Sequence, residues 1–349
     1  MRYPSFLPEN GTIGFIAPAF GCKREPYHSA FLSALDSFRE MGYEHRLGPN
    51  CFKDKGIGIS NTPKACADEF MRFYTSKKND ILLSCGGGEE MCEILPFIDW
   101  KRIDRARPKW FMGYSDNTNI GFLLATRCDT ASIYGPNGPT FGMEPWHPAL
   151  DDAMGILTGE AAKLCEGDVP GFVLHSYDLY EKESLKDEEN PLAPWNVTEP
   201  VEVRTFPGEN ASFSGRLLGG CLDCLSNLCG TRFDFVKDFN ERYRKDGVIW
   251  FLEACDLNVF GIRRALWQLR EAGWFDCAAG FMIGRPLNGE EMFGLDHFDA
   301  VLDILGPLDL SIIMDMDIGH VAPLMPLITG SMAHVEAGDG QATVRMELR

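Results

Sequence analysis

Short apolar segments alternate with amphipathic segments of helical periodicity along the N-terminal third of the chain. The predicted strands are Thr12–Ala17, His45–Leu47, Asp80–Cys85 and Pro108–Met112. The predicted helices are His28–Met41, Thr62–Thr75, Glu90–Leu95 (ending before Pro96) and Asn117–Leu124. Such alternation is typical of an α/β fold in which helices cover both faces of a mainly parallel, Rossmann-like sheet. Ligands of such sheets bind at the carboxyl ends of the strands.

The rest of the chain has a different pattern. Predicted strands at Phe213–Leu218, Gly247–Leu252, Phe281–Gly284 and Ser311–Met314 alternate with predicted helices at Leu222–Cys229, Ile262–Ala272 and Val301–Leu305, and a hairpin follows at Ala333–Glu336 and Ala342–Leu348. We therefore expect an N-terminal α/β domain at 1–150, a connection with a specificity loop at 151–205, and a smaller mixed α/β C-terminal domain at 206–349.

The charge and cysteine content limit the possible partners and compartment. Acidic residues outnumber basic ones by 51 to 33, and the net charge of -18 argues against nucleic acid and anionic membranes as partners. No run reaches the roughly 18–20 apolar residues of a membrane span, and the N-terminus has no apolar signal region. We expect a cytoplasmic protein whose twelve cysteines are reduced.

Cys221 and Cys224 form a C-x-x-C pattern that admits a redox or metal role. Such a role requires a redox βαβ context or a second ligand pair. Cys229 is close in sequence, but no histidine is. We expect no metal and no cofactor. A redox or metal protein that uses Cys221 and Cys224 stays open as an alternative. Bound metal, or a changed number of thiols on reduction, would indicate it.

Ser115 lies between a predicted strand and a predicted helix, which is the setting of a nucleophile elbow. Such a turn exposes the hydroxyl and places the free N–H groups of the helix N-terminus beside the reacting oxygen. Gly113 permits the close backbone approach that the turn needs. The alternative is that Ser115 begins a helix, with Asp116 or Asn117 as its cap.

A nucleophilic serine needs a base, and the base needs an orienting acid. Of the seven histidines, His320 has the most distinctive setting, because Gly319 and Pro323 flank it in a turn after a predicted strand. Glu253 is the candidate acid, since it ends the apolar run that begins at Gly247. Asp256 is its local competitor.

Two further segments are candidates for substrate contacts. Gly86–Gly88 follows a predicted strand and is either a plain turn or one side of an oxyanion hole, which needs an unobstructed backbone. Residues Tyr180–Asn196 are charged and contain prolines, as expected for a long exposed loop that acts as a lid or specificity element. Within that loop, Trp195 either packs on its own domain or lines the substrate cleft.

Five blocks in the chain resemble the family of LD-carboxypeptidases and microcin C self-immunity proteins. They are Gly87-Gly88 with Ile94–Asp99, Gly113–Asp116, Gly215–Gly220 with Leu225 and Gly230-Thr231, Phe251–Glu253, and Gly319–Val321. Each is weak alone, but their shared order is specific. The chain departs from the family pattern at Glu89–Cys92, where small polar residues are usual, and at Cys221, where asparagine is usual.

The resemblance implies an N-terminal α/β domain, a smaller C-terminal domain and a Ser–Glu–His triad. By position, Ser115 is the nucleophile, His320 the base and Glu253 the orienting acid. Gly87 or Gly88 and the Asp116 backbone N–H would form the oxyanion hole. Glu89 and Trp195 are the expected substrate contacts.

We therefore expect a serine carboxypeptidase or amidohydrolase. Its substrate would be a small murein peptide, cut at an L,D-peptide bond as in peptidoglycan recycling, or an aminoacyl-nucleotide of the microcin C type. The loop at Tyr180–Asn196 and the 349-residue length favour the second. We also expect a homodimer. The alternative function is a non-catalytic small-molecule binding protein on the same scaffold.

Overall fold

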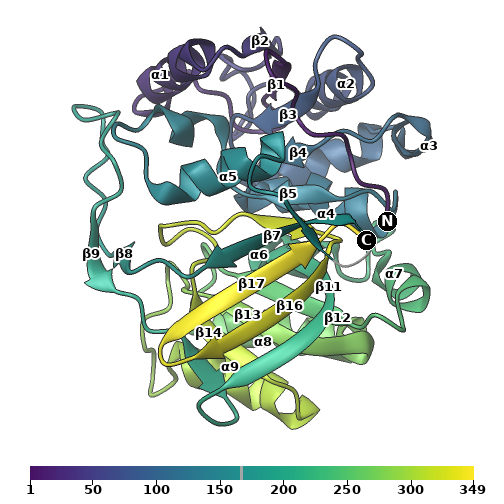
Figure 1. The fold of residues 1–349 in the computed structure, drawn as a ribbon, viewed down its shortest axis with the longest axis vertical. Coiled ribbons are helices and arrows are strands. Elements are labelled where there is room, and N and C mark those ends of the chain that lie inside the picture. The colour runs from purple at the N-terminus through teal and green to yellow at the C-terminus, as the bar shows by residue number, and fades with distance from the viewer. Residues whose placement is uncertain (166–167) are drawn as a thin grey trace.

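Two sheets with flanking helices make up the computed structural model, which describes residues 1–165 and 168–349 (Figure 1). The first sheet has the strand order β15-β5-β4-β3-β1-β2. Strands β1 to β5 are parallel, and β15 pairs with β5 in the antiparallel sense. The strands are β1 (Thr12–Ile16), β2 (Glu44–Leu47), β3 (Ile81–Ser84), β4 (Phe111–Met112), β5 (Ser132–Tyr134) and β15 (Leu327–Thr329). The predicted parallel sheet is confirmed.

Helices pack against both faces of this sheet. They are α1 (Tyr27–Glu40), α2 (Pro63–Tyr74), α3 (Trp100–Arg105), α4 (Thr118–Thr126) and α5 (Pro148–Thr158), with 3₁₀ helices η1 (Glu89–Phe97), η2 (Ser115–Asn117) and η3 (Gly138–Gly142). The predicted N-cap of α2 is confirmed, because Thr62 Oγ1 accepts from the Ala65 N–H. The predicted helix end before Pro96 is wrong. The Ile98 N–H donates to Leu95 O at 3.3 Å and so bypasses Pro96, which has no N–H.

The second sheet has the strand order β10-β14-β13-β12-β11-β16-β17-β7-β6. Its parallel centre, β11 to β14, is extended by antiparallel strands on both sides, so the predicted mixed architecture is confirmed. With nine strands it is the larger of the two sheets, and it includes strands from the predicted connection at 151–205. The strands are β6 (Lys163–Cys165), β7 (Val169–His175), β10 (Arg204–Phe206), β11 (Ala211–Cys221), β12 (Val248–Glu253), β13 (Ala278–Gly284), β14 (Ile312–Met316), β16 (Met332–Gly338) and β17 (Gln341–Glu347).

The C-terminal helices pack on one side of the second sheet, and a separate two-stranded ribbon projects beside it (Figure 1). The helices are α6 (Leu222–Leu228), α7 (Val236–Arg242), α8 (Val259–Glu271) and α9 (His297–Leu305), with 3₁₀ helices η4 (Trp274–Cys277) and η5 (Gly306–Leu308). The ribbon consists of β8 (Leu179–Glu181) and β9 (Val197–Pro200). It bounds the predicted loop, most of which lies between the two strands.

Two apolar clusters hold the halves together, one on each face of the sheets. Successive residues of a strand point to opposite faces. On β12, Trp250 and Leu252 therefore join the cluster around α2, α4 and α8, whereas Ile249 and Phe251 join the cluster around α1 and α5. Each cluster contains residues from both halves of the chain. The two sheets therefore form one continuous packed structure.

Strands cross the predicted domain boundaries in both directions. Strand β15, near the C-terminus, completes the first sheet, whereas β6, β7 and β10 belong to the second. The division at residues 150 and 205 stays a prediction. The termini lie side by side (Figure 1), where the Tyr3 hydroxyl donates to Arg349 O at 2.8 Å. Among the described residues, no helix has the length and apolarity that crossing a membrane requires.

Candidate active site

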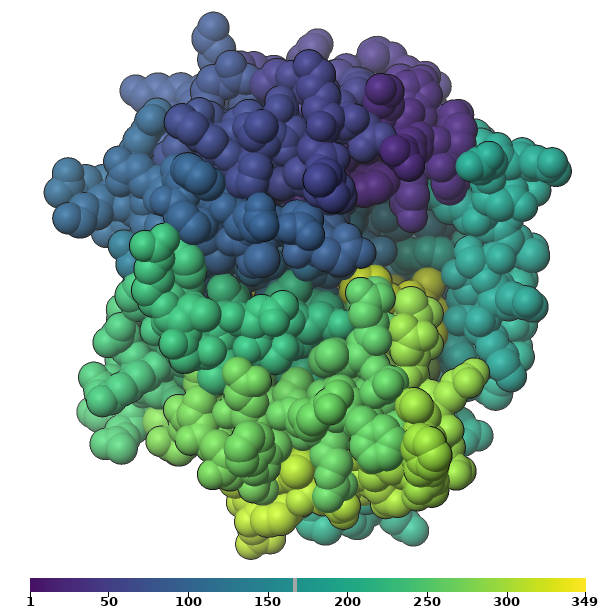
Figure 2. All heavy atoms as spheres, turned by 180° about the vertical axis from the view of Figure 1, so that it is seen from behind, coloured from purple at the N-terminus to yellow at the C-terminus, as the bar shows by residue number. Residues whose placement is uncertain are grey.

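The carboxyl ends of strands from both sheets face a cleft of about 1480 Å³. The segments that reach it follow β3, β4 and β5 in the first sheet and β11, β12 and β14 in the second. This is where parallel α/β sheets bind ligands. Figure 2 shows the residue 180–200 segment, in teal, along one side of the molecule, where it reaches from the N-terminal half to the C-terminal half.

Ser115 directly follows β4 and begins η2, which leads into α4. Its φ of 63° is in the left-handed region, where a non-glycine residue is strained. Gly113 is required nearby, because a Cβ there would lie 2.7 Å from the Asn117 side chain. Neither Asp116 nor Asn117 caps the helix through its side chain. The strained turn favours the nucleophile elbow over the simple helix start.

His320 and Glu253 form a close pair across the C-terminal part of the cleft. Glu253 ends β12, and His320 lies in the turn after β14. His320 Nδ1 is 2.9 Å from Glu253 Oε2, and the Glu253 side chain is buried. Gly319, at a φ of 105°, makes this approach possible, because a Cβ there would lie 2.5 Å from Glu253 Oε2. Of the two candidate acids, Glu253 rather than Asp256 contacts the imidazole.

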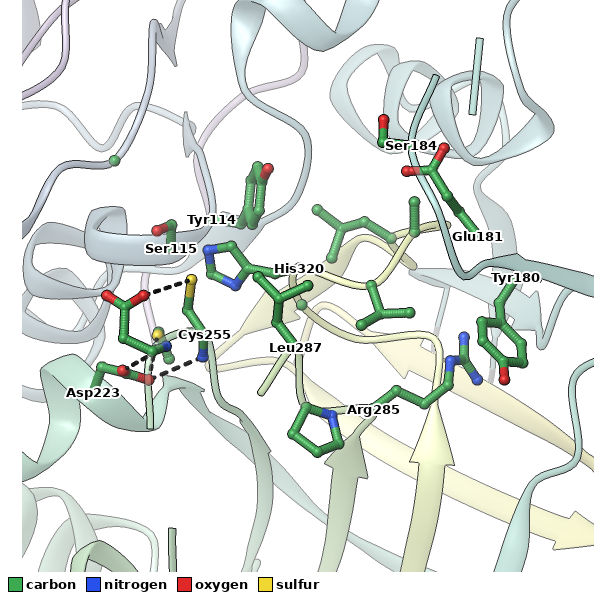
Figure 3. A pocket seen from close by; sticks show the side chains of 18 of the residues that line it. Tyr114, Ser115, Tyr180, Glu181, Ser184, Asp223, Cys255, Arg285, Leu287 and His320 are labelled. Carbon is green, nitrogen blue, oxygen red and sulfur yellow. Dashed lines mark hydrogen bonds between the residues drawn. The ribbon is translucent and has the colours of Figure 1, made fainter. Parts of the chain in front are cut away.

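The electrostatics of the pair favour a protonated imidazole in the free protein. Burial lowers the pKa of His320, but the Glu253 carboxylate, Cys255 and Tyr114 together raise it by more, so the net shift is upward. The Tyr114 ring lies 5.1 Å from the imidazole ring and covers one side of it. The Cys255 thiol lies beside the imidazole on another side (Figure 3). These neighbours hold the imidazole in one orientation at the cleft wall.

Tyr134 links the serine turn to the acid, and the sequence reasoning missed it. Its hydroxyl accepts from the Ser115 N–H at 3.2 Å and donates to Glu253 Oε1 at 2.5 Å. Tyr134 ends β5, the strand next to β4, and Gly135 and Pro136 follow it. The sequence feature that could have identified Tyr134 is a polar side chain at the end of a buried strand. The glycines and prolines of residues 134–148 predict a loop, which obscures this strand end.

A second link fixes the position of β11 against the elbow. Thr118 Oγ1 donates to Ser115 O at 2.7 Å and accepts from the Cys221 N–H at 2.9 Å. Gly220 permits this contact, since a Cβ there would lie 2.6 Å from Thr118 Oγ1. Because β11 and β12 pair so that Cys221 lies opposite Glu253, the same contact sets the position of the acid relative to the serine.

The Ser115 hydroxyl points towards Asp116 in this structure. Ser115 Oγ donates to Asp116 Oδ2 at 3.3 Å, and the Gly88 N–H donates to the same oxygen at 3.2 Å. Burial raises the pKa of the Asp116 carboxyl. In the described residues, the Gly87 N–H has no acceptor within the protein. Of the two glycines, Gly87 therefore has the donor that is free for a substrate oxygen.

Gly87 lies directly against the serine. A Cβ at this position would lie 2.8 Å from Ser115 Oγ and 3.0 Å from the Asp116 nitrogen. We expect Gly87→Ala to displace the elbow and lower kcat by about 10²–10³, the effect of losing one oxyanion donor. Gly306→Ala is the matched control, because a Cβ there meets nothing within 4 Å. Equal steady-state rates for the two variants would rule out this role of Gly87.

The two expected substrate contacts also line the cleft. Glu89 begins η1, directly after the glycine turn. Trp195 is half-buried and packs 5.2 Å from the ring of His147. Both alternatives for Trp195 therefore apply, since it packs on the protein and also faces the cleft. Cys221 and Cys224 are buried free thiols that donate to Asp223 and Asp116, respectively.

Family models match most of the chain. The model described as the LD-carboxypeptidase N-terminal domain matches residues 13–135, and the model of the C-terminal domain matches residues 214–335.

Curated relatives and solved structures also align with most of the chain. The chain is 25% identical to a probable murein peptide carboxypeptidase of Bacillus subtilis, over 98% of this chain and 93% of the relative. It is also 25% identical to the microcin C7 self-immunity protein MccF of Escherichia coli, over 84% and 83%. A structure of MccF in complex with glutamyl sulfamoyl guanosine superposes with a TM-score of 0.81 at 19% identity, over 99% and 98% of the two chains. An MccF-like protein from Streptococcus pneumoniae in complex with AMP superposes with a TM-score of 0.75 at 20% identity, over 96% and 98%.

Proposed function

The chain belongs to the LD-carboxypeptidase family of serine peptidases, and we propose that Ser115, His320 and Glu253 form its catalytic triad. The observation that supports this most is the buried contact between His320 Nδ1 and Glu253 Oε2 on the same cleft as the strained Ser115 turn. The order along the chain is Ser…Glu…His. Roles in such triads follow from geometry rather than from sequence order.

The proposed reaction is hydrolysis of an amide bond through an acyl-enzyme. Ser115 Oγ rotates away from Asp116 and attacks the substrate carbonyl, while His320 Nε2 takes its proton. The imidazolium then gives this proton to the leaving nitrogen, and the C–N bond breaks. Water, deprotonated by His320, attacks the ester and releases the acid and free Ser115. Glu253 stays ionised and holds Nδ1–H throughout.

We infer that the backbone N–H groups of Gly87 and Asp116 stabilise the tetrahedral intermediates. A Cβ at Gly87 would lie 2.8 Å from Ser115 Oγ and 3.0 Å from the Asp116 nitrogen, so this backbone borders the serine hydroxyl, and neither N–H makes the hydrogen bond that engages Gly88. Asp116 is also near the N-terminus of the helical segment that continues as α4, where the dipole favours negative charge. Such preorganised donors are often the largest single contribution to catalysis.

For the substrate, we favour an aminoacyl-nucleotide carrying a sulfamoyl or phosphoramidate link. The solved MccF structures bind aminoacyl sulfamoyl nucleosides, and they cover 99% of this chain. The 182–196 loop brings Trp195 to the cleft as a flat stacking surface, together with two cations, Lys182 and Lys186. Burial lowers the pKa of Lys186, and Glu181 opposes this shift. A half-buried cation favours an anionic or strongly polar linkage.

A murein tetrapeptide is the second candidate. The similarity to the Bacillus subtilis murein peptide carboxypeptidase extends over 98% of this chain, at the same 25% identity as to MccF. The same acyl-enzyme chemistry would release a terminal D-amino acid, whose carboxylate could pair with Lys186.

Direct comparison of the two substrates decides between them. The purified protein is incubated with a murein tetrapeptide and, separately, with aspartyl sulfamoyl adenosine, and the products are measured by mass spectrometry. We expect faster release of the sulfamoyl nucleoside. Faster loss of the terminal D-alanine would instead assign the protein to the murein branch.

Trp195→Ala tests the proposed stacking of a nucleobase. Stacking on an aromatic ring is worth about 1–3 kcal/mol per base, so KM for the sulfamoyl adenosine is expected to rise roughly tenfold or more with little change in kcat. Leu185→Ala, an exposed change on the same loop, is the control. An unchanged KM in Trp195→Ala would show that the indole does not stack on the base.

The expected homodimer and cytoplasmic location stay predictions. The twelve cysteines are all free thiols, as in proteins of a reducing compartment.

A further inference from the structure

The proposed mechanism leaves unused a thiol that lies against its acid and base. Cys221 Sγ, a carboxylate oxygen of Glu253 and a ring nitrogen of His320 all lie within 4.8 Å of one another. The first two are neighbours by fold, since Cys221 ends β11 opposite Glu253 on β12. Cys221 of the C-x-x-C pattern belongs to this cluster, whereas Cys224 faces Asp116 instead.

The three groups are a ligand set that zinc and cadmium bind. Zinc sites in proteins combine thiolate, imidazole and carboxylate ligands, with bonds of about 2.3 Å to sulfur and about 2.0 Å to nitrogen or oxygen. In tetrahedral geometry these bonds place the ligand atoms roughly 3.5 Å apart. Closing the cluster from 4.8 Å therefore needs side-chain movements of only about 1 Å.

The surroundings hold two of the ligands in place and favour positive charge. Tyr134 fixes Glu253, and Glu253 fixes His320. Cys221 Sγ donates to Asp223 Oδ2 at 3.3 Å, so a second carboxylate lies beside the sulfur that would become a thiolate. Ordered outer groups of this kind raise metal affinity.

The cluster is also accessible from the cleft. Cys221 and His320 both line it, whereas Glu253 lies behind them. The cleft provides an access route for an ion and a free coordination position for water. The Cys255 thiol lies on another side of the imidazole and is not one of the three clustered groups (Figure 3).

We infer that Cys221, Glu253 and His320 form a binding site for one soft divalent cation, Zn²⁺ or Cd²⁺, and that this ion inhibits the enzyme. Binding displaces the thiol proton and one proton of the His320 imidazolium, both of which go to solvent, and involves no oxidation or reduction. The bound ion occupies a His320 nitrogen and the Glu253 carboxylate, so His320 can no longer take the serine proton. The inhibition rests on the proposed function, whereas the binding does not.

Cadmium is the probe, because its bond to a thiolate gives an ultraviolet charge-transfer band. Reduced protein, freed of reductant, is titrated with Cd²⁺ while absorption, heat of binding and hydrolysis are recorded. We expect one tight ion per chain and loss of hydrolysis in parallel, reversed by a chelator. Cys221→Ser should lower the affinity by at least roughly 100-fold, since even outer-shell changes cost 10–100-fold.

Cys277→Ser is the matched control, because Cys277 is a partly exposed thiol on η4 outside the cleft. It should keep the tight site. His320→Gln gives a second test if Cys221→Ser does not fold, and it should also lose the tight site. Equal Cd²⁺ affinity in wild type and in these ligand variants would overturn the inference. The absorption band tests binding even if neither substrate is cleaved, so this failure is distinguishable from failure of the proposed function.

Discussion

Ser115→Ala is expected to lower kcat by about 10⁴–10⁶-fold on the substrate that the enzyme cleaves. The reason is that alanine has no oxygen to attack the carbonyl from the strained turn beside Gly87. The fold should survive, because within residues 1–165 and 168–349 the one hydrogen bond of Ser115 Oγ is the 3.3 Å contact with Asp116. Steady-state kinetics measures the loss, and circular dichroism checks the fold.

Ser226→Ala is the control for this substitution. Ser226 also lines the cleft, but its hydroxyl donates to Asp223 O within α6. The kcat of Ser226→Ala should stay within a few-fold of the wild-type value. Hydrolysis by Ser115→Ala at a similar rate would mean that another group, or an activated water, attacks the carbonyl.

Glu253→Gln is expected to lower kcat by roughly 10³–10⁴-fold while leaving the backbone in place. The carboxylate holds Nδ1–H of His320 at 2.9 Å, which leaves Nε2 free to accept the serine proton. A carboxamide can donate to Nδ1 instead and so favour the tautomer that cannot act as the base. The loss is measured as kcat at saturating substrate.

Glu253→Gln is also expected to shift the pH dependence of kcat/KM towards lower pH. Glu253 raises the pKa of His320 above the ordinary imidazole value, and the base must be neutral to act. Wild-type kcat/KM should therefore rise with pH through the neutral range into the alkaline range. Loss of the carboxylate lowers the pKa of His320, so the residual activity of Glu253→Gln should reach its plateau at lower pH.

Asp256→Asn is the matched control for the pH profile. Asp256 is a nearby acid, but its backbone is held by Asp223 and its carboxylate accepts from Cys255 rather than from His320. It should keep a profile close to that of wild type. An unchanged profile in Glu253→Gln would mean that Glu253 does not control the protonation of the base.

Most central strands and helices could be predicted, because local patterning determines them. Residues such as Ile81–Ser84 and Val248–Glu253 are buried on both faces and form continuous apolar runs. The edge strands were harder to predict from the sequence. β15 has only three residues, and it is a strand because it pairs with β5, nearly two hundred positions earlier. Such pairing depends on the tertiary fold and leaves no local periodicity.

The candidate site was predictable where a residue follows a recognisable strand. Ser115, Glu253 and His320 all do, and the structure brings Glu253 and His320 into contact. Tyr134 and Cys255 were missed. Their importance comes from neighbours on other strands, since Tyr134 bridges two sheets through its hydroxyl and Cys255 reaches His320. The engagement of the Gly88 N–H by Asp116 is likewise a tertiary contact.

The role of Ser115 as nucleophile is tested most directly by the site at which a serine-reactive fluorophosphonate modifies the active enzyme. The protein is labelled until hydrolysis stops, and the adduct is located by peptide mass spectrometry. A Ser115 nucleophile activated by His320 predicts one adduct per chain, on Ser115, with none in Ser115→Ala and much slower labelling in His320→Gln. An enzyme that the probe fully inactivates while Ser115 stays unmodified would contradict the account.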